Sequence, residues 1–486
     1  MIRRILRGLI VGALLVGALT GGTILLLRPP PLEVPAQGVV LVDVTLVNPG
    51  SGARAQQTIR ASSSVIDSIS AYSPALDGAP DARRYAGSYV LPGLIDMHVH
   101  HPIGRLPVDI ELFDLLHLSH GVTTVRDCGS IDGSVLETRA RIAAGEIAGP
   151  RIFACGPLID GDPPAWPGAE VARNTAEGER IADRAAAAGA DCIKAYSNLS
   201  PAALSGLRQA ATRHRLTLVG HVPAAVPFED AHLDDVQHLT GVPTARERPA
   251  AGLIAGILAG WDTIDDDRIA FVARTSVEQR IAHTPTMVAI ERLLRLVDYP
   301  ALLEDPAARM LPRYYREIIW KPGGMAGWTV PSLDQPSRAK IRQNICTVIR
   351  RLHQAGVVLH VGSDSLNPFV VPGVALHDEL RNFVECGFTA EQAWEAATRQ
   401  SGESVSPHGL GVLRAGAPAD MLVFRDDPAR DLSALSTLQA VVANGRLYPR
   451  HVLDGAVARY RENHDGWLYD RLMMLIFSLF TGSSEQ

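Results

Sequence analysis

A regular alternation of two segment types between residues 94 and about 400 constrains the fold most. Short apolar runs typical of strands take turns with longer amphipathic or alanine-rich runs typical of helices. Such alternation predicts a parallel sheet, because parallel strands need a crossover connection. We expect strands at 94–100, 123–129, 151–156, 192–198, 217–222, 235–241, 281–289 and 357–364. Eight strand–helix units over ~300 residues predict an α/β fold, a (β/α)8 TIM barrel.

Segments rich in valine, threonine and turn residues flank the predicted barrel. One covers residues 38–92 and the other 405–452, where Asn444-Gly445 predicts a hairpin turn. We expect both flanks to pair into one small β-sandwich domain beside a barrel over 93–404. Asp420, in the second flank, is expected to have a structural role.

Residues with nitrogen or oxygen donors close five of the predicted strands. They are His98, His100, Lys194, His221, His238 and Asp364. The active site of such a barrel lies at the carboxyl ends of its strands. His98 and His100 are two residues apart, so on a strand their side chains point to the same face. Neutral imidazole and carboxylate are ligands that zinc prefers.

The lysine strengthens the prediction of a metal site. The chain has three lysines, Lys194, Lys321 and Lys340, among 46 basic residues, so arginine is used almost everywhere. A lysine in an apolar strand between potential ligands suggests chemistry that arginine cannot perform. A neutral lysine amine can form a carbamate with carbon dioxide and bridge two metals, whereas arginine stays charged.

Several sequence motifs together resemble the amidohydrolase superfamily, in particular its imidazolonepropionase-like and prolidase-like members. The motifs are LPGLIDMHVH (91–100), GVTTVRDCG (121–129), GADCIKAYSNLS (189–200), VGHVP (219–223), VQHLTG (236–241), GSDS (362–365), APADMLVF (417–424) and VVANGRLY (441–448). The resemblance covers roughly residues 38–450. It specifies a superfamily and a metal site but no substrate.

The resemblance implies two divalent metal ions, expected to be zinc. His98, His100 and Asp364 would hold one ion, and His221 and His238 would hold the other. A carbamate on Lys194 would bridge them. Two histidines depart from the pattern: His101 extends the first motif, and His283, on the predicted seventh strand, has no assigned ligand role.

The expected reaction is hydrolysis of an amide or another C–N bond by a metal-bridging hydroxide, with a small molecule or short peptide as substrate. Asp364 would be the catalytic proton carrier. Tyr196, two residues after Lys194, is a candidate substrate-binding residue, with packing as the alternative. A mononuclear deaminase or cyclic amide hydrolase of the same fold, and a catalytically silent scaffold, stay open as alternatives. The first of these would not need Lys194.

The segment from 290 to 345 is long for a connection between the seventh and eighth strands. It contains Tyr314, Tyr315, Trp320 and Trp328. Loops on this face of a barrel set specificity. The aromatic residues suggest an apolar substrate or a lid, with ordinary packing as the alternative.

The N-terminal sequence predicts a transmembrane signal anchor over residues 8–28. Arginines within residues 1–7 precede twenty uncharged residues, 8–27, enough for a helix spanning a bilayer core of ~30 Å. Basic residues before the span predict a cytoplasmic segment 1–7 and an exported catalytic domain, on the periplasmic side of a bacterial inner membrane. Secretion after signal-peptide cleavage is the alternative. Glycine spacing in the span leaves a homo-oligomer open.

The apolar stretch 467–480, within the C-terminal tail 453–486, is too short to span a bilayer. It is predicted either to dock on the barrel or to lie on the membrane surface. The five cysteines show no tight spacing, so no disulfide framework is predicted and all five are expected to be buried apolar residues. A net charge of −6 argues against a nucleic-acid partner.

Overall fold

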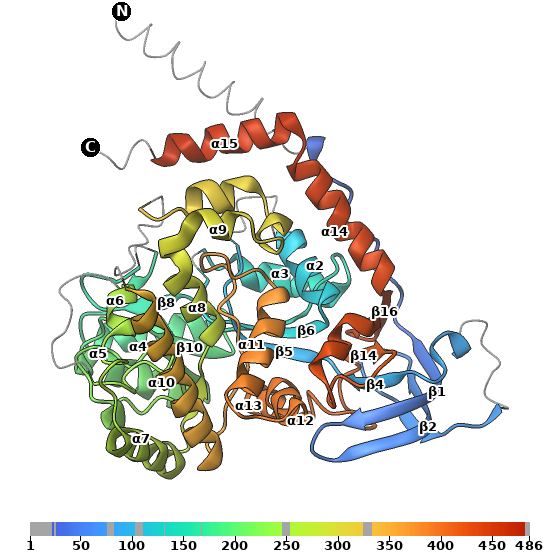
Figure 1. The fold of residues 1–486 in the computed structure, drawn as a ribbon, viewed down its shortest axis with the longest axis horizontal. Helices are drawn as coiled ribbons and strands as arrows, with labels where there is room; N and C mark the ends of the chain where they lie inside the picture. Colours follow the sequence, from blue (N-terminus) through green and yellow to red (C-terminus); the bar gives the residue numbers. More distant parts are fainter. Residues whose placement is uncertain are drawn as a thin grey trace, which may run out of the picture.

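The chain folds around a central barrel (Figure 1). The computed structural model describes residues 22–23, 26–74, 82–102, 110–130, 132–166, 168–244, 253–323 and 333–481. Barrel strands are β5 (Leu94–Val99), β6 (Val122–Asp127), β7 (Arg151–Ala154) continued by β8 (Leu158–Asp160), β10 (Cys192–Ala195), β11 (Thr217–Gly220), β12 (Asp235–Gln237) and β13 (Ala282–Thr284). They pair in parallel in the orders β5-β6-β7 and β8-β10-β11-β12-β13, and the short β9 (Glu170–Val171) pairs with β8.

Residues 357–364, predicted as the eighth strand, close the barrel without forming a regular strand. Parallel bridges join Leu359 to His283 and Ser365 to Val99. The amide of Asp364 donates to the carbonyl of His98 at 2.7 Å. Asp364 itself has φ of 61°, a left-handed conformation that interrupts a regular ladder. The position of the eighth segment was therefore predicted correctly, but its regularity was not.

The seventh strand is shorter than the predicted 281–289. It ends at Thr284, and a helix begins at Met287. Pro285 follows, and Thr286 adopts φ of 48°, so the chain leaves the extended conformation there. The apolar residues 287–290 are buried as part of that helix rather than of a strand.

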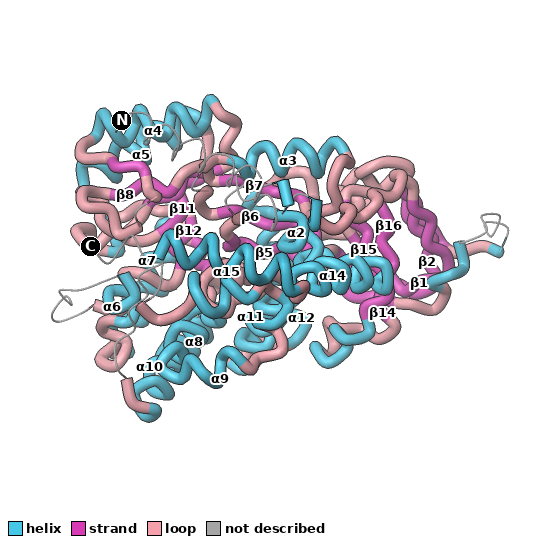
Figure 2. The backbone as a smooth tube through the Cα atoms, turned by 90° about the horizontal axis from the view of Figure 1, so that it is seen from above, coloured by secondary structure: helices cyan, strands magenta, loops and turns pink. Residues whose placement is uncertain are grey.

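Helices surround the barrel strands (Figure 2). They are α2 (Ile110–Ser119), α3 (Ser134–Ala144), α4 (Thr175–Ala187), α5 (Pro201–His214), α6 (Leu253–Leu258), α7 (Asp266–Gln279), α8 (Met287–Arg295), α9 (Tyr299–Leu303), α10 (Gln335–Gln354), α11 (Val374–Glu385), α12 (Ala390–Glu395) and α13 (Ser401–Val405). Side chains cap several of them: Asn174, Ser200, Asp265 and Asp334 each accept a hydrogen bond from a backbone amide in the first turn. Such caps satisfy donors that a helix start leaves unpaired.

The two flanks of the barrel join in one seven-stranded sheet. Its order is β16 (Arg446–Pro449), β15 (Leu438–Ala443), β14 (Met421–Phe424), β4 (Tyr89–Pro92), β1 (Val39–Asn48), β2 (Gly52–Ala61) and β3 (Ser68–Ala71). The two ends of the sequence meet where β14 pairs with β4. Asp420 accepts from the amide of Asn444 at 2.7 Å and pairs with Arg151 at 3.1 Å. It thus ties the hairpin turn to the barrel, in agreement with the structural role expected for it.

Two helices complete the described chain, α14 (Arg450–His464) and α15 (Trp467–Thr481). Figure 1 shows α14 running from the flank sheet to the top of the molecule, where α15 crosses above α9. No helix among the described residues is long and apolar enough to cross a bilayer. The span predicted over 8–28 falls largely in residues 1–21 and 24–25, outside the described residues, so the anchor stays a prediction.

The prediction for the cysteines was wrong for four of the five. Disulfides join Cys155 to Cys192 and Cys346 to Cys386, while Cys128 is free and buried. The separations of 37 and 40 residues hide the pairing in the sequence. The barrel accounts for the first pair. The amide of Asp191 donates to the carbonyl of Ala154 at 2.7 Å, which places the next residues, Cys192 and Cys155, side by side.

We predict that the unfolded, unreduced protein exposes one reactive thiol rather than five. Replacing Cys346 and Cys386 by serine should lower the free energy of unfolding by about 2–4 kcal/mol, because the disulfide restricts the unfolded chain. Thiol titration in denaturant and chemical denaturation check both statements. Reductant should lower the free energy of unfolding more in the wild type than in the double variant, because the variant already lacks the Cys346–Cys386 disulfide. Five thiols without reductant would contradict the pairing.

Candidate functional site

The carboxyl ends of the barrel strands bring all six predicted ligand residues together. His98 lies on β5, and His100 and His101 follow it. Lys194 lies on β10, and His221 and His238 directly follow β11 and β12. Only His100 is more than slightly exposed, with 24% of its side chain accessible. The site is therefore a largely buried cluster of ionisable groups in which His100 is the most exposed member.

His98, His100 and Asp364 form the tightest group. One potential ligand atom from each lies within 4.8 Å of the others. Oδ1 of Asp364 is 3.3 Å from Nε2 of His98 and 3.2 Å from Nε2 of His100. Nδ1 of His100 lies 3.2 Å from the carbonyl oxygen of Gly129, which favours a proton on that nitrogen and leaves Nε2 as the ligand.

His221 and His238 form the second group beside the first. Their ring centroids are 4.8 Å apart, and the ring of His238 is 4.7 Å from that of His98. Hydroxyl groups contact the Nδ1 atoms: Ser197 Oγ lies 2.7 Å from His221 and Thr286 Oγ1 lies 2.6 Å from His238. These contacts orient both rings and leave Nε2 as the second nitrogen of each.

Lys194 is fully buried below the histidines. Its Nζ donates to Oε1 of Gln237, whose Nε2 lies 3.0 Å from Sγ of Cys128. Burial lowers the pKa of Lys194 to about 8. A neutral amine is therefore accessible near physiological pH, as carbamate formation requires.

The protonation states and unpaired atoms of this cluster fit divalent metal ions. Burial, with help from Lys194, lowers the pKa of His98 and of His221 well below the usual value, so both imidazoles are neutral. Burial alone would raise the pKa of Asp364, but His238, His100 and Lys194 outweigh it and lower that pKa. Among the described residues, both ring nitrogens of His98, Nε2 of His221 and Oδ1 of Asp364 have no hydrogen-bond partner. Buried polar atoms left unpaired in one place are what a metal site presents without its ion.

Asp96 holds the two ligand-bearing segments together, and the sequence analysis missed it. Its carboxylate accepts from Oγ of Ser363 at 2.5 Å and from the amide of Ser363 at 2.8 Å. Burial raises the pKa of Asp96 to about 7 despite these bonds. A Cβ at Gly362 would lie 3.0 Å from Cβ of His98, so only glycine permits this approach. The aspartate within LIDMHVH was visible, but its partner lies 267 residues away.

The two histidines that departed from the family pattern have structural environments. His101 lies between Asp127 at 3.1 Å and Asp114 at 3.3 Å. Burial opposes its charge, but these two carboxylates raise its pKa to about 10. His283 faces the helix layer, where Nε2 is 2.9 Å from Oγ of Ser276. Neither residue joins the group of His98, His100 and Asp364.

Tyr196 lies beside the cluster, as the predicted substrate-binding role requires. Its ring centroid is 4.2 Å from that of His221, and Nζ of Lys194 is 5.7 Å from it. Burial raises the pKa of its phenol, so the hydroxyl stays protonated and can donate a hydrogen bond. The contact with substrate stays a prediction.

A separate buried network fills the opposite end of the barrel. Arg126 donates to Asp235 and, at 2.8 Å, to the carbonyl of Met97. Oδ2 of Asp235 also lies 3.2 Å from Nδ1 of His360, and Thr284 donates to the same oxygen at 2.8 Å. The barrel therefore encloses buried ionisable groups at both ends.

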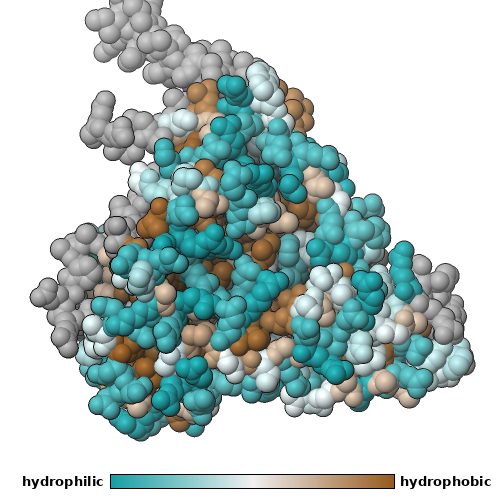
Figure 3. All heavy atoms as spheres, viewed as in Figure 1, coloured by the Kyte–Doolittle hydropathy of each residue, from teal (hydrophilic) through white to brown (hydrophobic). Residues whose placement is uncertain are grey.

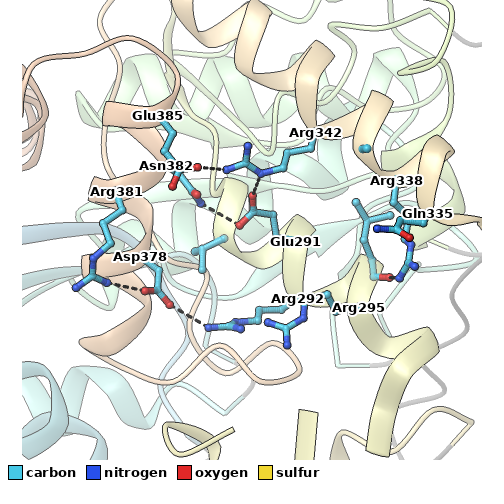
Figure 4. A pocket seen from close by; sticks show the side chains of 13 residues that line it. Glu291, Arg292, Arg295, Gln335, Arg338, Arg342, Asp378, Arg381, Asn382 and Glu385 are labelled. Carbon is cyan, nitrogen blue, oxygen red and sulfur yellow. Dashed lines mark hydrogen bonds and ion pairs between the residues drawn. The ribbon is translucent and has the colours of Figure 1, made fainter. Parts of the chain in front are cut away.

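A cavity of about 520 Å³ lies on the outer helix layer, between α8, α10 and α11. Figure 4 shows Arg342 directed at Glu291 and Glu385, while Arg292 reaches Asp378. These pairs neutralise much of the lining. The cavity contains none of the predicted ligands, so it is distinct from the candidate site.

Comparison with known proteins agrees with this architecture. The model of the amidohydrolase family matches residues 89–448. A bottromycin amidohydrolase structure superposes with a TM-score of 0.68 and 23% identity, over 90% of this chain and 93% of that chain. A Xaa-Pro dipeptidase structure gives 0.60 and 20% over 85% and 100%, and the A. niger ochratoxinase structure gives 0.58 and 19% over 85% and 96%. A search of curated proteins finds no match.

The family match extends from β4 to β16, so it includes the whole barrel and the strands that join both flanks. It also includes every predicted ligand residue. The predicted enzyme class, a hydrolase acting on carbon–nitrogen bonds, agrees with that match. The chain belongs to the amidohydrolase family.

Proposed function

We propose that the chain hydrolyses an amide or other C–N bond in a small peptide or N-acyl amino acid type of substrate. The observation that carries the proposal is the convergence of unpaired donor atoms from His98, His221 and Asp364 at the carboxyl end of the barrel. The structural neighbours named as a bottromycin amidohydrolase and a Xaa-Pro dipeptidase support this reaction class.

His98, His100 and Asp364 would hold one divalent ion, expected to be zinc, and His221 and His238 would hold the second. Lys194, as a carbamate, would lie between them. When bound, the two ions would polarise the scissile carbonyl and make a water molecule acidic enough to attack at neutral pH. A mononuclear deaminase or cyclic amide hydrolase is the second candidate, and Lys194 separates the two because only the dinuclear site uses it.

Asp364 would transfer protons, and Tyr196 would orient the substrate. Oδ1 of Asp364 faces both His98 and His100, while Oδ2 lies 3.7 Å from Nδ1 of His238. Oδ2 is therefore the atom available to take the proton of the attacking water and return it to the leaving nitrogen. The Tyr196 hydroxyl would orient the substrate by donating a hydrogen bond.

We also propose that the catalytic domain is exported and held at a membrane by the N-terminal segment. Two features support this: the charge-free sequence 8–27 follows basic residues, and four of the five cysteines form disulfides. Disulfides persist in the periplasm and outside the cell but are rare in the cytosol. Secretion after cleavage is the alternative location.

Lys194→Ala should abolish binding of the second metal equivalent. Elemental analysis should find two ions per wild-type chain and at most one in the variant, with most of the activity lost. Bicarbonate should promote metal reloading of the chelated wild type but not of the variant, because only the wild type can form the carbamate. Lys340→Ala, at an exposed lysine, is the matched control and should load like the wild type. One tightly held ion, unaffected by Lys194→Ala, would rule out the bridge and favour the mononuclear candidate.

Asp364→Asn should lower kcat by about 10² or more while metal content stays close to that of the wild type. Asparagine keeps one oxygen ligand but cannot accept the proton. Metal content, melting temperature and kcat should be measured on the same preparation. A near-normal kcat in correctly folded variant protein would remove Asp364 from proton transfer.

A reporter that is active only after export, fused after residue 50, should be active in cells. The arginines within residues 1–7 should retain the N-terminus in the cytoplasm. Replacing these arginines by glutamate provides the control and should reduce export of the reporter. A soluble mature protein that begins near residue 37 would show that the segment is cleaved instead.

A further inference from the structure

Helix α15 is apolar on two faces, of which one packs on the protein. Tyr469, Met473 and Phe477 are spaced four residues apart and are buried. The ring of Phe477 stacks on Tyr314 with centroids 4.3 Å apart. This inner face confirms the docked alternative for the C-terminal tail, but it accounts for only part of the apolar residues.

The other face of α15 carries exposed apolar side chains. Trp467 is 73% exposed, Leu468 43% and Leu475 58%, and Leu26 nearby in the fold is 88% exposed. These are four of the eight exposed large hydrophobic residues in the described chain, and the other four are valines at separate positions outside α15. Figure 3 shows hydrophobic atoms at the top of the molecule, where α15 lies. We call Trp467, Leu468 and Leu475 the outer face of α15.

The N-terminal segment joins the protein at the same corner. The carbonyl of Leu27 accepts from Nδ2 of Asn463, near the end of α14. Arg28 pairs with Glu111 at 3.0 Å, and Tyr460 donates to the same carboxylate. The uncharged sequence 8–27 therefore connects to the folded chain beside the start of α15.

A series of aromatic contacts links α15 to the catalytic face. Nε1 of Trp320 donates to the carbonyl of Leu366 at 3.1 Å, two residues after Asp364. The rings of Trp320 and Tyr315 are 5.5 Å apart, and those of Tyr315 and Tyr314 are 4.9 Å apart. Tyr314 then stacks on Phe477 of α15. Tyr314, Tyr315 and Trp320 of the predicted aromatic segment thus pack between the residues that follow Asp364 and α15, whereas Trp328 lies outside the described residues.

We propose that the outer face of α15 rests in the lipid–water interface of a bilayer and turns the catalytic face toward that membrane. A 15-residue helix, about 22 Å long, presents tryptophan and leucine outward together with Arg471, whose stem can extend its charge to the headgroups. Tryptophan favours this interface. Given the proposed amide hydrolysis, on which this consequence rests, the substrate class is amphiphilic: N-acyl amino acids whose acyl chain partitions into the membrane.

Bromine quenching tests the docking directly, without reference to activity. The full chain is reconstituted in phosphatidylethanolamine–phosphatidylglycerol vesicles that contain lipid brominated on its acyl chains. Tryptophan fluorescence of the wild type should be quenched, and Trp467→Phe should lose most of that quenching. Equal quenching in both proteins, or none in the wild type, would overturn the proposal. A dimer that dissociates in Leu475→Glu, without quenching in the wild type, would assign the face to a second copy and also overturn it.

Substrate delivery is tested with the double variant Leu468→Glu/Leu475→Glu in the same vesicles. Its KM for a hexadecanoyl amino acid should rise about tenfold, whereas hydrolysis of the water-soluble acetyl analogue should not change. Val65→Glu/Val277→Glu, at exposed valines outside α15, is the matched control and should behave like the wild type. An unchanged KM for the long-chain substrate would overturn delivery from the membrane. If the wild type hydrolyses neither amide, the proposed function fails, while the quenching result still decides the docking.

Discussion

The hydrogen bonds between Asp96 and Ser363 are the contacts on which the candidate site depends. They join the first barrel strand to the segment that closes the barrel, and they place Asp364 beside His98 and His100. A strand and a closing segment separated by more than 260 residues have no local turn to fix their register, so side-chain contacts must do so. The fully buried carboxylate accepts two hydrogen bonds from Ser363 and one from the amide of His98, so a register shift that removed Ser363 would leave it short of partners, which is costly.

The ligand residues could be predicted from the sequence, whereas the residues that support them could not. Histidine, lysine and aspartate at strand ends stand out in apolar surroundings, and parallel strands bring those ends together. Ser197 and Thr286, which orient His221 and His238, are residue types common in any loop. Their role depends on distances of 2.6–2.7 Å across 24 and 48 residues, and no spacing rule encodes such contacts.

The disulfides are also contacts that the sequence alone did not predict. Cys155 and Cys192 have no motif, yet they close neighbouring positions of the barrel, the third and the fourth. Once eight strands in order are accepted, the two cysteines fall at adjacent edges, and their pairing follows from the barrel rather than from sequence spacing. The irregular eighth segment was harder to predict, because the φ of 61° at Asp364 is set by closure against β5 and not by local propensity.

The charge network at the far end of the barrel bears on the chemistry of Lys194. Burial is the largest influence on the pKa of that lysine and lowers it, while Arg126 lowers this pKa further and Asp235 raises it. The pKa of Asp235 is itself lowered, because the attraction of Arg126 and the bond to His360 outweigh burial. Removing either partner would leave an unpaired buried charge, a loss of about 3–5 kcal/mol in comparable cases. The Arg126–Asp235 ion pair thus places opposite charges together at that end of the barrel, and the burial of Lys194 favours loss of its proton.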